Sequence, residues 1–399
     1  MRETMRVRAA ALFFSAIVVI TAQATGVSAI GQESPGRRDL AIGPVGEVRT
    51  LAGGPAIFDS VAITPDGTTV VAGDRDGLLR IWTVGGGAIE RSIRGRILKT
   101  DAVAISPDGR KVASCGPGRS RTDEDPNSFS RGLKFFEGSI IEVWNASTGR
   151  SLAMIEPTGL AHGLAFDLDG STIAAILSGD AAGIGIWRAD GGRSIRSLGG
   201  PGRLNRGMFF RGPEVPLAFG RDLKQVATLE FLHRDAIRLW AVSKERTDDI
   251  RLEADRPPVT SCALSRDGST LAMIDADQVL TIWSTESLKI RKLGRPEPSP
   301  PNLGPFPVGH MAARRPLVLA YDRSGTCIVA GVADGTLRIY DASTAELLTI
   351  VRGPASPVRA LAFEPDRISV ISGGWSTPID GSLSPSPLLY WQAGATPNP

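Results

Sequence analysis

Short apolar runs that end in a polar turn recur along the chain. Val61 to Gly67 reads Val-Ala-Ile-Thr-Pro-Asp-Gly, Val103 to Gly109 repeats it with Ser for Thr, and Leu164 to Gly170 is a third copy. Proline presets φ at the first central position of a turn, and glycine tolerates positive φ, so each copy predicts a hairpin turn between two strands. Continuous apolar runs of this length are typical of strands that are buried on both faces.

An aromatic residue closes a second apolar run downstream of these turns, as in Leu79-Arg80-Ile81-Trp82. The aromatics recur at intervals of 43 to 62 residues. Periods in this range indicate one supersecondary unit stacked on itself. The aromatic positions are Trp82, Trp144, Trp187, Trp240, Trp283, Tyr340 and Trp391.

A further apolar run follows several of the aromatics, for example Ile89 to Gly95, Ile195 to Gly199 and Ile290 to Gly294. Each unit then contributes four strands, which we name a to d in chain order. Four strands in each of seven units predict an all-β fold, a seven-bladed β-propeller of four-stranded blades.

The last blade lacks a strand d of its own, because only residues 392–399 follow Trp391. Glu47 to Gly53 has the strand d pattern, with no strands a to c before it. We therefore expect this N-terminal strand to pair with blade 7 and close the ring, which removes two open sheet edges. The predicted propeller spans residues 46–392, after a linker of residues 30–45 and before a tail of residues 393–399.

The N-terminus has the layout of a secretory signal peptide. Arg2, Arg6 and Arg8 precede an apolar stretch from Ala9 to Ala22, and small residues follow at Ala22-Gln23-Ala24 and Val27-Ser28-Ala29. The stretch is short for the roughly 20 residues of a membrane-spanning helix. Residues 1–29 are therefore predicted to be a signal peptide, with an uncleaved anchor as the alternative, and the propeller is expected to be secreted or periplasmic.

The features that carry a family resemblance are the turn phrase, an aspartate in the b–c turn and an aromatic-Asp end to strand c. Over roughly residues 46–392 the chain resembles the WD40-repeat family. The turn aspartate lies six positions before the aromatic at Asp76, Asp277 and Asp334, and Tyr340-Asp341 is the intact aromatic-Asp pair. The resemblance implies a scaffold for protein–protein interaction. Gly309-His310 is the one candidate for the family's Gly-His pair, so the hydrogen-bond network within a blade that the family uses could form in at most one blade. Apolar packing between blades is therefore expected to stabilise the ring.

Composition narrows the possible functions. Lys plus Arg number 45 and Asp plus Glu 42, so no global field draws the chain to nucleic acid or to a membrane surface. The three cysteines, Cys115, Cys262 and Cys327, are expected to be buried thiols, with a pairing of Cys262 and Cys327 on neighbouring blades as the alternative. No zinc motif, nucleophile elbow or phosphate-binding loop is found, so we expect no metal, no cofactor and no catalysis.

The longest connections are predicted on one face of the disc. The a–b and c–d turns emerge on one side, here called the lower face, and the b–c and d–a connections emerge on the other, here called the upper face. Residues 117–137, 199–214, 293–316 and 374–387 are long upper-face loops, where binding residues concentrate. The candidate binding residues in or beside them are Arg119, Arg121, Phe135, Phe136, Arg206, Phe209, Phe210, Arg211, His310, Arg314, Arg315 and Trp375.

A protein or peptide partner, bound by a monomeric ring, is the favoured interpretation, because Arg and Trp are enriched at interface hot spots. The Phe pairs could instead pack under their own loops, with the arginines merely solvated. One alternative is a carbohydrate or cell-envelope polymer stacked on Trp375 and the Phe pairs. Another is a propeller hydrolase or lactonase, which the Val, Ala, Ile and Leu residues of the strand a runs disfavour, because no titratable cluster is predicted at matching positions of several blades.

Overall fold

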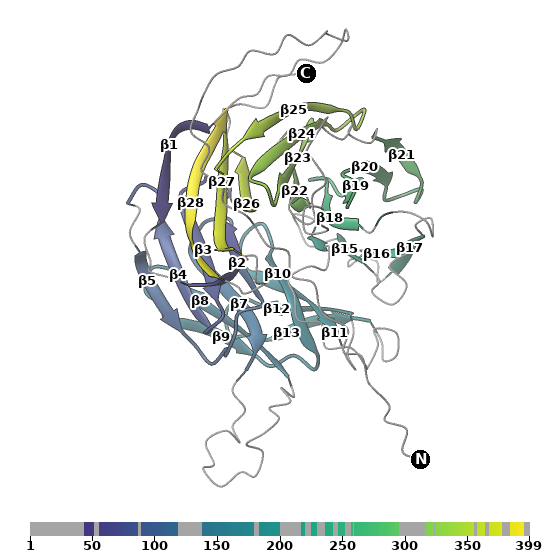
Figure 1. The fold of residues 1–399 in the computed structure, drawn as a ribbon. Coiled ribbons are helices and arrows are strands. Elements are labelled where there is room, and N and C mark those ends of the chain that lie inside the picture. The colour runs from purple at the N-terminus through teal and green to yellow at the C-terminus, as the bar shows by residue number, and fades with distance from the viewer. Residues whose placement is uncertain are drawn as a thin grey trace, which may run out of the picture.

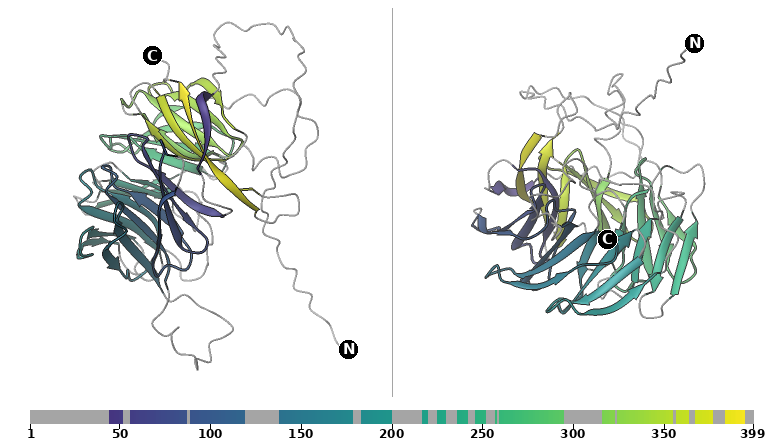
Figure 2. Two further views of the ribbon diagram at one scale, coloured as in Figure 1. Left: turned by 90° about the vertical axis from the view of Figure 1, so that its left-hand side faces the viewer. Right: turned by 90° about the horizontal axis from the view of Figure 1, so that it is seen from below.

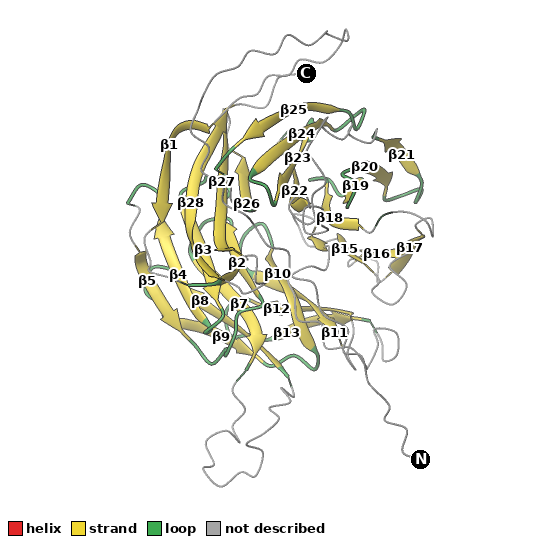
Figure 3. Cartoon of the chain, viewed as in Figure 1, coloured by secondary structure: helices red, strands yellow, loops and turns green. Residues whose placement is uncertain are grey.

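The structure is a computed structural model. It describes residues 44–51, 56–86, 89–118, 138–178, 183–199, 217–219, 225–229, 236–241, 246–251, 257, 259–294, 316–322, 324–354, 357–363, 367–376 and 384–394. Within these ranges every regular element is a strand, as Figure 3 shows. No helix in these ranges is long and apolar enough to span a membrane.

The strands form seven four-stranded antiparallel sheets, which confirms the predicted blades (Figure 1). The first strand of a blade lies nearest the centre of the ring and the last lies outermost. Blade 1 is β2 (Phe58–Ile63), β3 (Thr69–Asp74), β4 (Leu78–Thr83) and β5 (Ile89–Arg94); blade 2 is β6 (Ala102–Ile105), β7 (Lys111–Pro117), β8 (Ser139–Asn145) and β9 (Ser151–Ile155); blade 3 is β10 (Leu160–Phe166), β11 (Thr172–Ser178), β12 (Gly183–Arg188) and β13 (Ser194–Leu198).

The remaining blades repeat this arrangement. Blade 4 is β14 (Leu217–Phe219), β15 (Gln225–Leu229), β16 (Ala236–Ala241) and β17 (Arg246–Arg251); blade 5 is β18 (Val259–Leu264), β19 (Thr270–Asp275), β20 (Leu280–Ser284) and β21 (Ile290–Leu293); blade 6 is β22 (Pro316–Tyr321), β23 (Cys327–Val332), β24 (Thr336–Asp341) and β25 (Leu347–Arg352); blade 7 is β26 (Val358–Phe363), β27 (Arg367–Ser376), β28 (Ser384–Gly394) and β1 (Pro44–Leu51).

The N-terminal strand closes the ring as predicted. β1 pairs antiparallel with β28, and Arg49 lies opposite Tyr390 and Leu51 opposite Leu388. In Figures 1 and 2 the purple first strand therefore lies beside the yellow last strand. The strands extend two residues beyond the predicted limits of 46 and 392 at each end, because β1 begins at Pro44 and β28 ends at Gly394.

Apolar clusters fill the interfaces between neighbouring blades. Val71 of strand β3 packs toward blade 2, whereas Val70 and Ala72 pack toward blade 7, so this strand is buried on both faces as its composition predicts. Seven such clusters join consecutive blades, including blade 7 to blade 1, and complete the ring. This arrangement agrees with the expectation that packing between blades stabilises the fold.

Each recurring aromatic lies in a different one of these seven clusters, between its own blade and the preceding one. Trp82 lies between blades 7 and 1, and Trp391 between blades 6 and 7. Both side chains are completely buried, and Phe58 meets the Trp82 ring edge to face at 5.9 Å. The sequence period therefore reflects one aromatic at each interface between blades. The full set is Trp82, Trp144, Trp187, Trp240, Trp283, Tyr340 and Trp391.

The three cysteines are buried and carry free thiols, as predicted. Burial raises the pKa of the Cys115 thiol, and the nearby charge of Asp101 adds to the shift. Burial likewise raises the pKa of Cys262 to about 12. These thiols act as small apolar side chains in the packing rather than as nucleophiles.

The structure corrects one b–c connection and adds detail to another. The long b–c loop of blade 7 was expected over residues 374–387, but β27 continues to Ser376 and β28 begins at Ser384, with Trp375 opposite Pro385. In blade 1, Asp76 lies in the b–c turn as predicted, and the structure adds that Asp74 organises this turn. The buried Asp74 carboxylate accepts the backbone N–H groups of Asp76 and Leu78 at 3.0 and 2.8 Å.

Candidate binding site on the upper face

A β-bulge recurs near the first residues of strand a, at the end of the strand that lies on the upper face. The pairing of strands a and b shifts register by one residue in five described blades. A bulge redirects the side chain of its extra residue and is frequent beside functional sites. Blade 2 has no such shift, and Asp101 takes the equivalent place just before β6. We call these positions the bulge ring; its described members are Asp59, Asp101, His162, Thr260, Leu317 and Arg359.

The bulge ring corrects the expectation that matching positions of several blades hold no titratable groups. Ionisable residues occupy it in four consecutive blades, namely Arg359 in blade 7, Asp59 in blade 1, Asp101 in blade 2 and His162 in blade 3. Sequence reasoning missed them because they precede the apolar phrase. The signal was present, since each residue lies two positions before the first residue of that phrase.

Asp59 is the centre of a charged cluster over blades 1 and 2. Its side chain is only 4% exposed, and both carboxylate oxygens lie 3.1 Å from Nε of Arg75. Nζ of Lys99 lies 3.3 Å from Asp59 and 2.9 Å from Asp101. A buried carboxylate requires such partners, because an unpaired buried charge is strongly unfavourable. The cluster therefore links the strand a ends of two neighbouring blades.

The connector from blade 1 to blade 2, residues 95–101, is held in place along its length. The N–H of Arg96 donates to Oε2 of Glu142 at 3.0 Å, and the N–H of Leu98 donates to the carbonyl of Pro117 at 2.9 Å. Burial raises the pKa of Glu142, while the backbone N–H groups of Arg96 and Ile97 act in the opposite direction.

Close backbone approach completes this fixation. A Cβ at Gly116 would overlap the carbonyl oxygen of Lys99, so glycine is needed where the connector crosses β7. Ile97 forms an isolated bridge with Gly118, which lies at the start of the first predicted long loop, residues 117–137. The connector therefore lies against the base of that loop.

His162 occupies the bulge ring in blade 3. Its Nε2 lies 2.5 Å from Oγ of Ser178, at the end of β11. Burial lowers the pKa of His162, and the negative charge of Asp101 partly offsets this effect, so the imidazole is neutral at neutral pH. A serine and a neutral histidine can form a catalytic nucleophile–base pair when a third group orients the histidine. Among the described residues no carboxylate accepts a hydrogen bond from His162 and could orient it in this way.

The other described bulge side chains bond within their own blades. Oγ1 of Thr260 donates to the carbonyl of Ile274 at 3.1 Å, and Nε of Arg359 donates to the carbonyl of Gly373 at 3.1 Å. Both acceptors lie in strand b near its upper end. The bulge residues thus tie strand a to strand b on the upper face.

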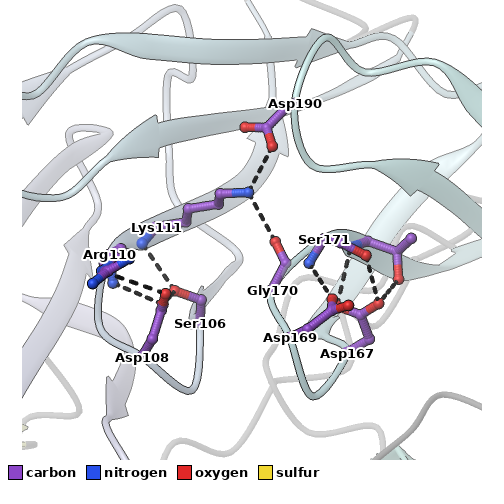
Figure 4. Close-up of polar contacts among 10 residues, drawn as sticks. Ser106, Asp108, Arg110, Lys111, Asp167, Asp169, Gly170, Ser171 and Asp190 are labelled. Carbon is purple, nitrogen blue, oxygen red and sulfur yellow. Dashed lines mark hydrogen bonds and ion pairs between the residues drawn. The ribbon is translucent and has the colours of Figure 1, made fainter.

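The lower face is organised differently, by hydrogen bonds within its turns. In blade 2, Oγ of Ser106 donates to Asp108 at 2.6 Å and accepts the N–H of Lys111 at 2.9 Å (Figure 4). In blade 3, Asp169 accepts the N–H of Ser171 at 2.7 Å. Nζ of Lys111 crosses between these blades and donates to the carbonyl of Gly170 at 3.0 Å and to Asp190 at 2.8 Å. Polar side chains of these lower-face turns therefore stabilise the turns and also join blade 2 to blade 3.

The candidate residues from the sequence fall largely outside the described residues. Trp375 lies in β27, whose upper end adjoins Gly373 and Arg359, and its side chain is not described. The other predicted positions keep the status of predictions. They are Arg119, Arg121, Phe135, Phe136, Arg206, Phe209, Phe210, Arg211, His310, Arg314 and Arg315.

The chemistry of the site favours recognition. In the described part of the chain no group of three or more His, Cys, Asp or Glu side chains could hold a metal ion. The bulge ring and the connector instead offer fixed charges and hydrogen-bonding groups on a rigid frame. Such groups can position the side chains of a binding partner without reorganisation.

A family model described as WD domain, G-beta repeat (WD40) matches residues 47–83. The match begins in β1 and ends at the last residue of β4, so the repeat comprises strand d of blade 7 followed by strands a to c of blade 1. The chain is therefore a β-propeller that carries a WD40 repeat, and that repeat contains the closure of the ring.

The chain is also similar to a protein of Schizosaccharomyces pombe named meiotic recombination protein rec14. The two are 27% identical over 145 residues, which is 36% of this chain and 43% of that protein. The matched region thus spans less than half of the relative's length.

Proposed function

We propose that this chain is an exported, non-catalytic propeller that holds a protein partner on its upper face. The bulge ring is the observation that carries the proposal. It places ionisable side chains at the upper ends of four consecutive inner strands, next to the base of a predicted long loop. WD40 propellers commonly bind proteins, and the matched repeat supports the same role here.

Export rests on the sequence of residues 1–29, which lie outside the described residues. Their charged start, apolar core and small-residue sites support a signal peptide. The similarity to a meiotic recombination protein supports the repeat architecture over part of the chain. A role in recombination is not part of the proposal.

The geometry of the chain ends determines how the protein should be immobilised. Pro44 lies opposite Ala393, at the c–d end of β28, so both ends of the described ring lie at the lower face. A C-terminal tag therefore leaves the upper face accessible to a partner.

The test is affinity capture from the extracytoplasmic fraction with the chain immobilised in this way. A loop variant carries Phe136→Ala, Phe210→Ala, Arg211→Ala and Trp375→Ala, and a lower-face control carries Arg150→Ala and Arg193→Ala. We expect the parent and the control to recover the same protein and the folded loop variant to lose it. Recovery of no protein by the parent, or retention on cell-envelope glycan instead, would reject a protein-binding role.

A further inference from the structure

Positively charged side chains on and beside the blade 1–blade 2 connector are accessible to solvent. Arg94 and Arg96 are exposed, and the side chains of Arg75 and Lys99 are 42% and 32% exposed. The carboxylate that holds Arg75 and Lys99 belongs to Asp59, which is buried beneath them. We call Arg75, Arg94, Arg96 and Lys99 the basic patch.

Contacts of Arg94 and of the connector bring the cations of the basic patch to the b–c turn of blade 1. Nη1 of Arg94 donates to the carbonyl of Asp76 at 2.9 Å, which places it beside the b–c turn that contains Arg75. The N–H of Thr100 donates to the carbonyl of Asp74 at 3.2 Å, which places the connector against the same turn. The turn carries Arg75, the last residue of β5 is Arg94, and the connector that follows carries Arg96 and Lys99.

The frame beneath the patch is rigid before any partner arrives. Glu142 and Pro117 hold the connector backbone from blade 2, and Asp74 holds it from blade 1. Ile97 and Thr100 are 3% and 0% exposed, so buried side chains next to Arg96 and Lys99 anchor the connector. Binding of a partner here therefore costs little free energy for ordering the connector backbone.

We propose that the basic patch docks an acidic peptide segment of the protein partner. The inference rests on the proposed function and specifies the chemistry of what the upper face binds. Arg75 uses its Nε for Asp59, and the other donors of a guanidinium can meet a second carboxylate. Lys99 and Arg96 add donors on the same connector.

The charge pattern favours a peptide over nucleic acid. Asp76 is exposed and the Asp101 side chain is 34% exposed, so two solvent-accessible carboxylates lie among the four cations, in addition to the buried carboxylates of Asp59 and Glu142. A peptide can place its carboxylates over the cations and neutral or basic residues over Asp76 and Asp101. A phosphate backbone carries charge at every step and would meet these carboxylates, and such like-charge contacts are unfavourable.

The test measures fluorescence anisotropy of a labelled glutamate decapeptide with the purified full chain. Neutral Gly-Ser decapeptide and single-stranded DNA of ten nucleotides are the comparison probes. The first variant carries Arg94→Glu and Arg96→Glu, a milder one carries Arg94→Gln and Arg96→Gln, and the lower-face control carries Arg150→Glu and Arg193→Glu. The unfolding midpoint of each variant establishes that it is folded.

We expect the parent and the lower-face control to bind the glutamate peptide alike, and more tightly than either comparison probe. The Glu variant should bind it about tenfold or more weakly, with the Gln variant between the two, and higher salt should weaken the parent's binding. Equal binding by upper-face and lower-face variants, or tighter binding of DNA than of peptide, would overturn the inference. If affinity capture recovers a partner that the Arg94 and Arg96 substitutions do not affect, the inference fails while the proposed function stands.

Discussion

Nζ of Lys99 lies 3.3 Å from the buried carboxylate of Asp59, although 40 residues separate the two in the chain. Lys99 belongs to the connector that leads into blade 2, whereas Asp59 belongs to the inner strand of blade 1. The pair therefore fixes the position of the connector on the upper face. Arg75 shares the same carboxylate from the b–c turn.

Removing this carboxylate should destabilise the fold. Asp59→Ala leaves the donors of Arg75 and Lys99 without their common acceptor, and we expect the free energy of unfolding to fall by about 1–3 kcal/mol in urea denaturation. Arg110→Ala is the control, because Arg110 is 83% exposed and lies 3.8 Å from Asp108. An exposed pair of this kind contributes roughly 0–1 kcal/mol. Equal losses for the two variants would show that the Asp59 cluster contributes no more than a surface pair.

The blade aromatics should be the largest single contributors to packing. Trp391 is completely buried between blades 6 and 7, and its Nε1 donates to Oγ of Ser372 at 3.3 Å. We expect Trp391→Ala to lower the free energy of unfolding by about 3–5 kcal/mol, measured by urea denaturation. Ile195→Ala, at a side chain that is 48% exposed, should change it by less than about 1 kcal/mol. A comparable effect at the two positions would contradict the packing described for the interface between blades.

Because β1 closes the ring, we expect the fold to require this strand but to accept it from the other end of the chain. Deleting residues 44–51 exposes the edge of β28, and we expect the product to aggregate in size-exclusion chromatography. Moving residues 44–51 to follow Gly394 through a turn of about five residues should restore a monomeric ring, because strand d follows strand c directly in the other blades. A monomeric deletion variant with the parent's unfolding midpoint would mean that β1 does not close the ring.

The lower-face turns predict loss of stability in acid. Oγ of Ser265 donates to Asp267 at 2.7 Å and the N–H of Ser269 donates to it at 3.0 Å, and these bonds lower the pKa of Asp267. Because the folded pKa lies below the unfolded value of about 3.9, this contribution is complete above that value and is lost as the pH falls through the folded pKa. Asp267→Asn should therefore be less stable than the parent at about pH 5, and the difference should shrink at about pH 2.5. A difference that stays constant between these pH values would exclude the carboxylate as its source.

The repeat architecture could be predicted from the sequence because local sequence patterns specify it. The Val-Ala-Ile runs, the Pro-Asp-Gly turns and the regular aromatics each depend on a few adjacent residues. The closing strand could also be predicted, because residues 47–53 match strand d and blade 7 lacks one. The structure adds that the recurring aromatics, from Trp82 to Trp391, occupy the seven interfaces between blades, one at each interface. The period alone does not predict this placement.

The site was less predictable, because its residues come together through backbone register and long-range contacts. A bulge is a change in strand pairing, and the apolar pattern around Asp59 or His162 does not encode it. Comparing the residues two positions before each phrase would have found the ionisable set. The partnership of Lys99 with Asp59 depends on the packing of the connector, for which the sequence has no local signal.

The most direct test of the account is site-specific photo-cross-linking in the producing cell. A photoreactive residue replaces Arg96 on the upper face in one strain and Arg193 on the lower face in another, since both positions are exposed. We expect a covalent adduct with another protein at position 96 and none at position 193. An adduct at position 193 alone, or none at either position, would contradict a protein interaction on the upper face.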